Sequence, residues 1–359
     1  MNILLFGEYS GLFNCLKDGL VAIGHDVTLV SDGDGPKDYD SDFRWDVKFP
    51  IKPIARLLGY LNLIIHYKKI IGYDVVMFVS PTMSKYQLVN RLVYGLLVNR
   101  NKKSYLVSSG LYSTSFEFWY SKVDSKYYHY TSQSLEEPDA QGEAARYNKP
   151  EMIKWENQLF DRITGIIPIW YEYAEPYRNH PKLMPAIRIP INLNKYTYVP
   201  NIVKDKIVFF HGKTRACKGG RFIVEAFNRL RDKYKEEAEF VAMDKVVPFD
   251  EYIQLMKRVN VILDDANSYS FAMNVLFAMA QGKICMGGAE PEGDKELGYT
   301  YNPVFNITCD VNQICDQIEY IIKHKEKITE WGELSRKFVE EYHNYIEIAK
   351  DYERAVSNN

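Results

Sequence analysis

The sequence predicts an α/β fold with two Rossmann-like domains, and three observations lead to that prediction. The chain has 359 residues, about twice a common domain length. Short apolar runs typical of buried strands alternate with amphipathic helical segments, the pattern of parallel βαβ units. Five of the 15 prolines fall between Pro176 and Pro200 and interrupt this alternation, so we expect an interdomain linker near Asn192–Asn201.

The segments before the linker form one doubly wound domain. Apolar runs predict buried strands at residues 3–6, 27–30, 75–79, 104–107 and 163–169. Apolar residues at helical spacing predict helices at residues 12–23, 48–71, 83–98 and 151–160. Residues 111–148 show no clean period, and an irregular segment of that length inside a compact domain is usually functional.

The same alternation restarts after the linker. Strands are predicted at residues 206–210, 239–243, 261–263 and 284–286, and helices at residues 220–234, 250–258 and 274–280. Residues 311–356 are predicted to be helical with charged faces. We place the first domain at residues 1–192 and the second at 193–342. We expect parallel sheets, a cleft between the domains, and a C-terminal helix at about 343–359 that packs back on the first domain.

Charge and cysteine usage exclude several classes of protein. Lys and Arg number 45 and Asp and Glu 47, so the chain lacks the basic surplus of a nucleic-acid-binding protein. Its five cysteines form no C-x-x-C pair, which is typical of a reduced, cytoplasmic protein. The apolar start is short and has no basic leader, so we interpret it as a strand rather than a signal peptide. No apolar run reaches the roughly 18 residues of a membrane span.

One apolar segment leaves two interpretations open. Residues 57–65 are apolar except for glycine, Tyr60 and Asn62, and basic residues flank them at Lys48, Lys52, Arg56, Lys68 and Lys69. Such a helix can lie in a membrane interface, which would make residues 48–73 a peripheral contact with the inner face of a membrane. The alternative is a helix packed on the sheet, with its charged side chains reaching water at both ends.

The chain contains 28 tyrosines, and some of them lie close together in the sequence. Residues 111–148 contain seven Tyr and Trp residues, at Tyr112, Trp119, Tyr120, Tyr127, Tyr128, Tyr130 and Tyr147. A ring with a hydroxyl suits both half-buried packing and contact with a sugar. The clustering favours sugar contact over packing.

Two glycine-containing loops follow the first strand of each half. Gly7–Gly11 lies where backbone N–H groups and a helix N-terminus meet a ligand at the sheet edge, although it could be only a tight turn. His211–Gly220 places Lys213, Arg215 and Lys218 before a helix, which indicates a phosphate site; the alternative is a solvated basic loop. Neither loop has the G-x-G-x-x-G or Walker pattern.

Two further loops follow later strands of the second half. Asp264–Asn274 offers hydroxyl, amide and N–H groups at the carboxyl edge of the sheet, with Asp264 and Asp265 as helix caps or general bases. Glu290 and Glu292 follow the next strand and could contact a hydroxyl-rich ligand or form a solvated turn. The histidines show no metal-binding spacing, and no nucleophile elbow is present, so we expect no metal site.

Together these motifs resemble the retaining GT-B glycosyltransferases of family four, over nearly the whole chain. The family's motifs match at Ser10-Gly11, Gly24–Val30, Gly212-Lys213, Lys218-Gly219 and Ala278–Lys283. The family also carries two glutamates eight positions apart, which contact the donor sugar and the ribose. This chain has Tyr269 and Phe277 there, so both contacts would come from other residues.

The resemblance implies a cytoplasmic transferase that uses a nucleotide-diphosphate sugar, without a cofactor or metal, and retains the anomeric configuration. Lys218 with Lys213 or Arg215 would neutralise the leaving diphosphate. The implied donor-binding residues are Ser10, Gly11, Gly212, Gly219, Ser268, Tyr269, Ser270, Asn274 and Glu290. A glycan or lipid-linked acceptor of bacterial surface polysaccharide synthesis would meet Glu8, Tyr9, Tyr112, Trp119 and Tyr120. The alternatives are an inactive nucleotide-sugar-binding module and a nucleotide-sugar epimerase.

Overall fold

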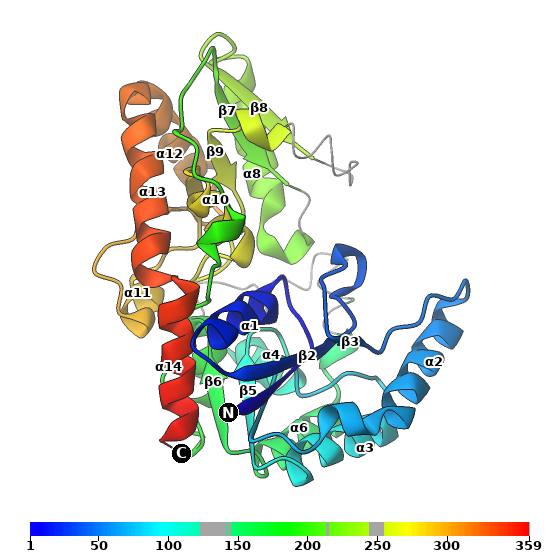
Figure 1. Ribbon diagram of the computed structural model, residues 1–359. Helices are drawn as coiled ribbons and strands as arrows, with labels where there is room; N and C mark the ends of the chain where they lie inside the picture. Colours follow the sequence, from blue (N-terminus) through cyan, green and yellow to red (C-terminus); the bar gives the residue numbers. More distant parts are fainter. Residues whose placement is uncertain (123–141, 143–144, 213–214, 244–254, 359) are drawn as a thin grey trace. The chain divides into compact units, whose positions relative to one another are not determined.

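A computed structural model describes the chain except for residues 123–141, 143–144, 213–214, 244–254 and 359. The chain divides into two compact units, each with its own parallel sheet (Figure 1). Unit 1 comprises Met1–Phe118, Tyr147–Asn192 and Asn344–Asn359, and unit 2 comprises Trp119–Arg146 and Leu193–His343. The predicted two-domain α/β fold is confirmed.

Unit 1 contains six parallel strands in the order β3-β2-β1-β4-β5-β6. In chain order they are β1 (Asn2–Phe6), β2 (Asp26–Ser31), β3 (Phe43–Arg44), β4 (Val75–Phe78), β5 (Lys103–Ser108) and β6 (Gly165–Pro168). β1 lies inside the sheet, where Leu4 pairs with Thr28 on one side and Val76 on the other. Side chains on both faces of β4 are buried, which explains why such strands are continuous apolar runs.

Helices cover this sheet. They are α1 (Leu12–Ala22), α2 (Lys52–Ile65), α3 (Gln87–Asn99), α6 (Pro150–Phe160), α7 (Tyr171–Ala174) and, from the end of the chain, α14 (Tyr345–Ser357), whereas the boundary between the units falls within α4 (Ser113–Ser121). Short 3-10 helices lie at η1 (Gly35–Lys37), η2 (Tyr67–Ile70) and η4 (Glu175–Tyr177). α14 packs against α1 so closely that a Cβ on Gly19 would lie 2.2 Å from the Tyr345 carbonyl oxygen.

In its described residues, unit 2 contains five parallel strands in the order β11-β10-β9-β7-β8. They are β7 (Ile207–His211), β8 (Ala238–Ala242), β9 (Val261–Leu263), β10 (Ile284–Gly287) and β11 (Phe305–Asn306). The helices are η5 (Leu193–Lys195), η6 (Ala216–Lys218), α8 (Gly220–Arg231), α10 (Met273–Ala280), α11 (Pro291–Leu297), α12 (Val311–Lys323), η7 (Lys325–Lys327) and α13 (Ile328–Tyr342). α8 packs against α12 and α10 against α13. The side chains on both faces of β7, β9 and β10 are buried.

Some predicted segments differ from the structure. The helix expected at 83–98 begins only at Gln87, because the Asn90 amide oxygen accepts from the N–H groups of Met83 and Ser84 and holds them in a turn. The helix expected at 48–71 ends at Ile65 and is followed by η2. The segment expected to be irregular at 111–148 contains α4, and most of its remainder lies outside the described residues, as does most of the helix expected at 250–258. No helix in the described part of the chain is both long and apolar enough to cross a membrane.

Candidate functional site

Three neighbouring strands of unit 2 bring three loops to one edge of the sheet. β9 lies between β7 and β10, with Val261 paired to Phe209 on one side and Ile284 on the other. Loops that follow neighbouring parallel strands meet at their carboxyl edge, where ligands bind in open α/β sheets. The loops begin after His211, Leu263 and Gly287.

Lys218 is held in the first of these loops by the second. Its Nζ lies 3.3 Å from Asp265 Oδ2, and the exposed fractions of the two side chains are 18% and 5%. The Lys218 N–H donates to the Arg215 carbonyl (3.0 Å), and the Lys218 carbonyl accepts from the Ala266 N–H (3.0 Å). The lysine is therefore positioned by both its backbone and its side chain, close to the end of β9.

The next residue, Gly219, begins α8 in a conformation that requires glycine. Its φ is 77°, and a Cβ there would lie 2.7 Å from Cys309 Sγ. Glycine has no side chain that could cap the helix, so the positive N-terminal end of α8 is not neutralised by its N-cap residue. This helix end follows Lys218 directly in the sequence. Arg215, whose side chain is exposed, adds a second cation to the same loop. A helix N-terminus with two adjacent cations is a favourable place for a diphosphate.

His211 ends β7 beside this loop and does not add a third charge. Its Nδ1 lies 3.0 Å from the Leu263 carbonyl oxygen, and the side chain is buried. Burial lowers the pKa of His211, and this effect outweighs the hydrogen bond to Leu263 and the charge of Asp264, which raise it. The neutral imidazole must donate from Nδ1 to the carbonyl, so Nε2 carries the lone pair and can accept a hydrogen bond.

Two buried oxygen atoms in the loop after β9 have no hydrogen-bond partner among the described residues. They are Asp264 Oδ2 and Asn267 Oδ1, on side chains that are 5% and 2% exposed. Asn267 is otherwise fixed, since its N–H donates to Asp265 Oδ1 (3.0 Å) and its Nδ2 to the Cys217 carbonyl (2.8 Å). Buried acceptors are rarely left unpaired, so both oxygens are candidates to accept from hydroxyl or N–H groups of a ligand.

Glu290 joins the loop after β10 to the loop after β9. It is buried, its N–H donates to the Tyr269 carbonyl (3.0 Å), and its Oε1 accepts from Asn306 Nδ2 (2.6 Å). Close approach of the two loops also requires glycine, because a Cβ on Gly288 would lie 2.2 Å from the Ser268 carbonyl oxygen. Glu290 therefore holds the loop after β10 against the loop after β9.

The other predicted residues of unit 2 fall into different environments. Ser268 and Ser270 are buried at the sheet edge, Tyr269 and Gly212 are half-buried, and Asn274 is exposed near the start of α10. Lys213 lies outside the described residues. Phe277 stacks on Tyr196 with ring centroids 4.8 Å apart, so the position of the family's second glutamate serves packing here.

In unit 1, Glu8 has a structural role that the sequence analysis did not assign to it. The side chain is buried, and its carboxylate accepts from the N–H groups of Gly11 (3.0 Å), Phe13 (3.3 Å) and Asn14 (2.9 Å). Asn14 Nδ2 adds a fourth hydrogen bond at 2.7 Å. Glu8 thus caps α1, and burial raises the pKa of its carboxyl. Its contact with an acceptor stays a prediction beside this capping role.

Ser10 and Gly11 are likewise engaged by the protein itself. The Ser10 N–H donates to Asp34 Oδ2 (2.8 Å), Lys37 Nζ donates to Ser10 Oγ (2.6 Å), and the Gly11 N–H is bound by Glu8. These N–H groups were expected to bind donor phosphates. Because carboxylates already occupy them and would repel an anion, we leave Ser10 and Gly11 out of the proposed donor site.

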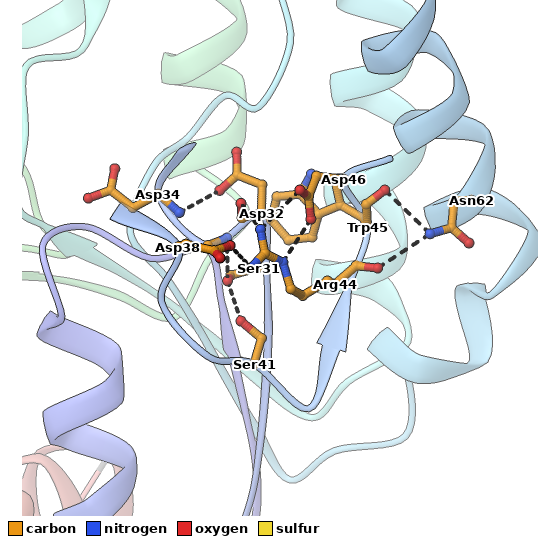
Figure 2. A network of polar contacts seen from close by, with 10 residues as sticks. Ser31, Asp32, Asp34, Asp38, Ser41, Arg44, Trp45, Asp46 and Asn62 are labelled. Carbon is orange, nitrogen blue, oxygen red and sulfur yellow. Dashed lines mark hydrogen bonds and ion pairs between the residues drawn. The ribbon is translucent and has the colours of Figure 1, made fainter. Parts of the chain in front are cut away.

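The loop that carries Asp34 is held by an arginine network (Figure 2). Arg44 donates from Nε and Nη2 to the two carboxylate oxygens of Asp46, both at 2.9 Å, and from Nη1 to Asp38 Oδ1 at 2.5 Å. Its guanidinium lies so close to Gly33 that a Cβ there would be 2.7 Å away. All these groups are paired within the protein, so the network supports the loop and offers no unoccupied charge.

The predicted acceptor aromatics separate into two groups. Tyr112 is buried and its hydroxyl donates to the Val79 carbonyl (2.5 Å), and Trp119 is also buried. Tyr9 and Tyr120 are half-buried. The one hydroxyl donor of Tyr112 is used inside the core, and its contact with an acceptor stays a prediction. Tyr127, Tyr128 and Tyr130 lie outside the described residues.

Sequence reasoning missed three members of the unit 2 site. His211 was not named as a candidate, Asn267 was passed over, and Asp265 was interpreted as a cap or base rather than as the partner of Lys218. Their shared signal is position, since each ends a strand or follows it within a few residues at the carboxyl edge. Among the described residues, no three His, Cys, Asp or Glu side chains are grouped as metal ligands.

No protein-family model matches the sequence, and no curated protein is similar to it in sequence. Solved structures are similar over the full chain. A sucrose-phosphate synthase from Thermosynechococcus elongatus covers 100% of this chain and 99% of its own, with a TM-score of 0.64 and 15% identity. HepE of Anabaena, solved with UDP and glucose, covers 100% of both chains, with a TM-score of 0.60 and 12% identity.

The chain has the GT-B fold. WaaG, a glycosyltransferase involved in lipopolysaccharide biosynthesis, supports the same conclusion, with a TM-score of 0.57, 13% identity and coverage of 99% of this chain and 100% of its own. At these identities the similarity establishes the architecture alone. The function must be argued from the residues at the unit 2 sheet edge.

Proposed function

We propose that this protein transfers a sugar from a nucleotide-diphosphate sugar to a glycan or lipid-linked acceptor in bacterial surface polysaccharide or glycoconjugate synthesis. The observation that carries the proposal is Lys218, held by Asp265 at the N-terminus of α8. A solved GT-B structure supports it, because HepE has been crystallised with UDP-glucose. WaaG, which shares the fold, acts in lipopolysaccharide biosynthesis.

In the proposed reaction, the bond between the anomeric carbon and the diphosphate oxygen breaks, the acceptor hydroxyl oxygen forms the new bond to that carbon, and the hydroxyl proton passes to the leaving diphosphate. Lys218, with Lys213 or Arg215, stabilises the negative charge that grows on the leaving diphosphate. Asp264 Oδ2 and Asn267 Oδ1 accept from hydroxyl groups of the donor, and replace contacts that paired glutamates would make. We propose that the reaction retains the anomeric configuration and needs neither metal nor cofactor.

Binding of the donor is tested by thermal shift with UDP, GDP, ADP and CMP and their sugars. Lys218→Ala should weaken binding of the preferred nucleoside diphosphate about tenfold to a hundredfold, because a charge-assisted hydrogen bond contributes about 1.5–3 kcal/mol. Lys233→Ala is the matched control, since it removes the same charge from a surface ion pair with Glu319 in the same unit. Unchanged affinity in a folded Lys218→Ala protein would overturn the proposed site.

Transfer itself is tested by release of the nucleoside diphosphate with and without glycan and lipid-linked acceptors. Acceptor-dependent release is the expected result. Tight binding without turnover would identify a nucleotide-sugar-binding module, an alternative that the packing of Phe277 on Tyr196 favours because it leaves no ribose-binding carboxylate there. Conversion of the free nucleotide sugar without an acceptor would identify an epimerase.

A further inference from the structure

Helix α2 of unit 1 carries an exposed apolar stripe. Ile54, Leu57, Leu61 and Ile65 have exposed fractions of 40%, 57%, 45% and 72%. Their spacing of three, four and four residues places them on one face of the helix. A row of large aliphatic side chains in water is unusual for the outer face of a helix, where polar residues are the rule.

The opposite face of α2 is the one that packs against the unit. Leu63 is fully buried, and a Cβ on Gly59 would lie 3.0 Å from the Trp45 carbonyl oxygen. Asn62 Nδ2 donates to the carbonyls of Arg44 and Trp45, both at 3.3 Å (Figure 2). The helix is thus anchored through one face, and the apolar stripe on the other face has no part in holding it.

The stretch of sequence that contains α2 is strongly basic. Residues 47–116 contain ten Lys and Arg but one acidic residue, Asp74, which Lys102 pairs at 2.7 Å. The remainder of the chain carries 35 Lys and Arg against 46 Asp and Glu, so positive charge is concentrated in this part of an acidic protein. Five of the ten cations are exposed and lie in α2 or close to its ends: Lys52 and Arg56 in its first turns, Lys48 before it, and Lys68 and Lys69 after it.

We propose that α2 and its basic flanks dock the protein on an anionic lipid bilayer, with the helix lying in the plane of the interface. Aliphatic side chains then enter the acyl boundary while Lys and Arg meet anionic headgroups. A second copy of the chain is a poorer partner for this surface, because a symmetric contact would bring like charges together. At about 1.5 Å per residue, a helix of 14 residues is shorter than the hydrocarbon core of a bilayer, so it lies on the membrane rather than across it.

The test is sedimentation of the full chain with vesicles of phosphatidylcholine alone and of phosphatidylcholine mixed with phosphatidylglycerol. We expect binding to the anionic vesicles and little to the neutral ones. Leu57→Gln with Leu61→Gln, and separately Lys68→Gln with Lys69→Gln, should each lower the partition coefficient about tenfold or more. All four side chains are exposed, so the variants keep the fold, which their melting temperatures check.

Matched controls lie on unit 2. Val199→Gln with Ile202→Gln removes two equally exposed apolar side chains, and Lys325→Gln with Lys327→Gln removes two exposed charges. Both controls should bind the anionic vesicles as the native chain does. Equal binding to neutral vesicles, equal losses in the controls, or a dimer that dissociates when Leu57 and Leu61 are replaced would each overturn the proposal. Because the test needs no sugar transfer, it is independent of the proposed function.

Discussion

The N–H groups that begin α1 converge on one buried carboxylate, that of Glu8. Glycine precedes both helices, as Gly11 before α1 and Gly219 before α8, but three residues before Gly219 the chain has Ala216, which offers no carboxylate. Both helices follow a strand and a glycine-containing loop, so their sequences suggest that both N-termini bind a ligand. The carboxylate makes the difference, because it neutralises the positive end of α1 and leaves that of α8 as the better place for an anion.

Replacing Glu8 tests this capping role. Glu8→Ala leaves several N–H groups of α1 without an acceptor and should cost about 2 kcal/mol of unfolding free energy, while Glu8→Gln, which keeps one oxygen, should cost less. Urea denaturation measures both values. The exposed Glu117 on α4 provides the control, since its replacement by Ala should change stability by about 0.5 kcal/mol or less. A Glu8→Ala protein as stable as this control would contradict the capping role.

The buried His211 should make stability fall in acid. Its pKa in the folded protein is lowered from 6.5, so below about pH 6.5 the unfolded chain binds a proton that the folded chain does not. This contribution to stability is therefore complete above that pH and is lost as the pH falls. In His211→Asn, whose amide can still donate to the Leu263 carbonyl, the loss of stability between about pH 7 and pH 5 should be smaller. If the native protein and His211→Asn lose the same stability over this pH range, the proposed contribution of His211 is wrong.

At the scale of elements, α1 and α14 lie so close together that position 19 has room only for glycine. A Cβ on Gly19 would lie 2.2 Å from the Tyr345 carbonyl oxygen, a backbone atom that cannot move without shifting α14. α14 comes from the far end of the chain, so this contact ties the last residues to the first helix. No local signal in residues 12–22 reveals it, because the partner is more than 300 residues away.

The same substitution at two helical glycines should have opposite effects. Gly19→Ala should lower the unfolding free energy by about 3 kcal/mol, since the methyl group forces α14 away from α1. Gly95→Ala, in α3, should raise it by about 0.5–1 kcal/mol, since nothing lies within 4 Å of the new methyl group and alanine favours a helix. Denaturant unfolding gives both signs. Loss of stability in both variants would show that space at the glycine does not decide the outcome.

At the scale of the whole molecule, the two units have separate hydrophobic cores. One core includes Phe78, Tyr94 and Trp155 of unit 1, and the other includes Phe209, Phe227 and Ile318 of unit 2. A chain with two cores need not unfold in a single cooperative step.

Calorimetry should therefore resolve two unfolding transitions that respond to different changes. The preferred nucleoside diphosphate should raise the transition of unit 2, because the proposed anion site lies wholly in it. Gly19→Ala should lower only the transition of unit 1. One transition, shifted by both changes, would indicate that the two cores unfold together.

Much of the fold could be predicted because strands such as β4 are buried on both faces and appear as continuous apolar runs. The two-residue edge strands β3 and β11 were missed, since two residues are too few to show a period. The candidate site was predicted only in part. Lys218 stands out in its loop, whereas its partner Asp265 is 47 positions away and can be assigned only when the order of the strands is known.

The sequence by itself determined the alternation of strands and helices, the basic loop before α8 and the apolar character of α2, because each depends on residues close together in the chain. Only the tertiary structure decided which groups meet. It placed Asp265 beside Lys218, and it brought the Glu8 carboxylate within hydrogen-bond distance of the N–H groups that begin α1. It also buried one face of α2 and left the apolar stripe on the other face exposed. The physical reason is that burial and hydrogen bonding join residues far apart in sequence, through a strand order that local periodicity does not specify.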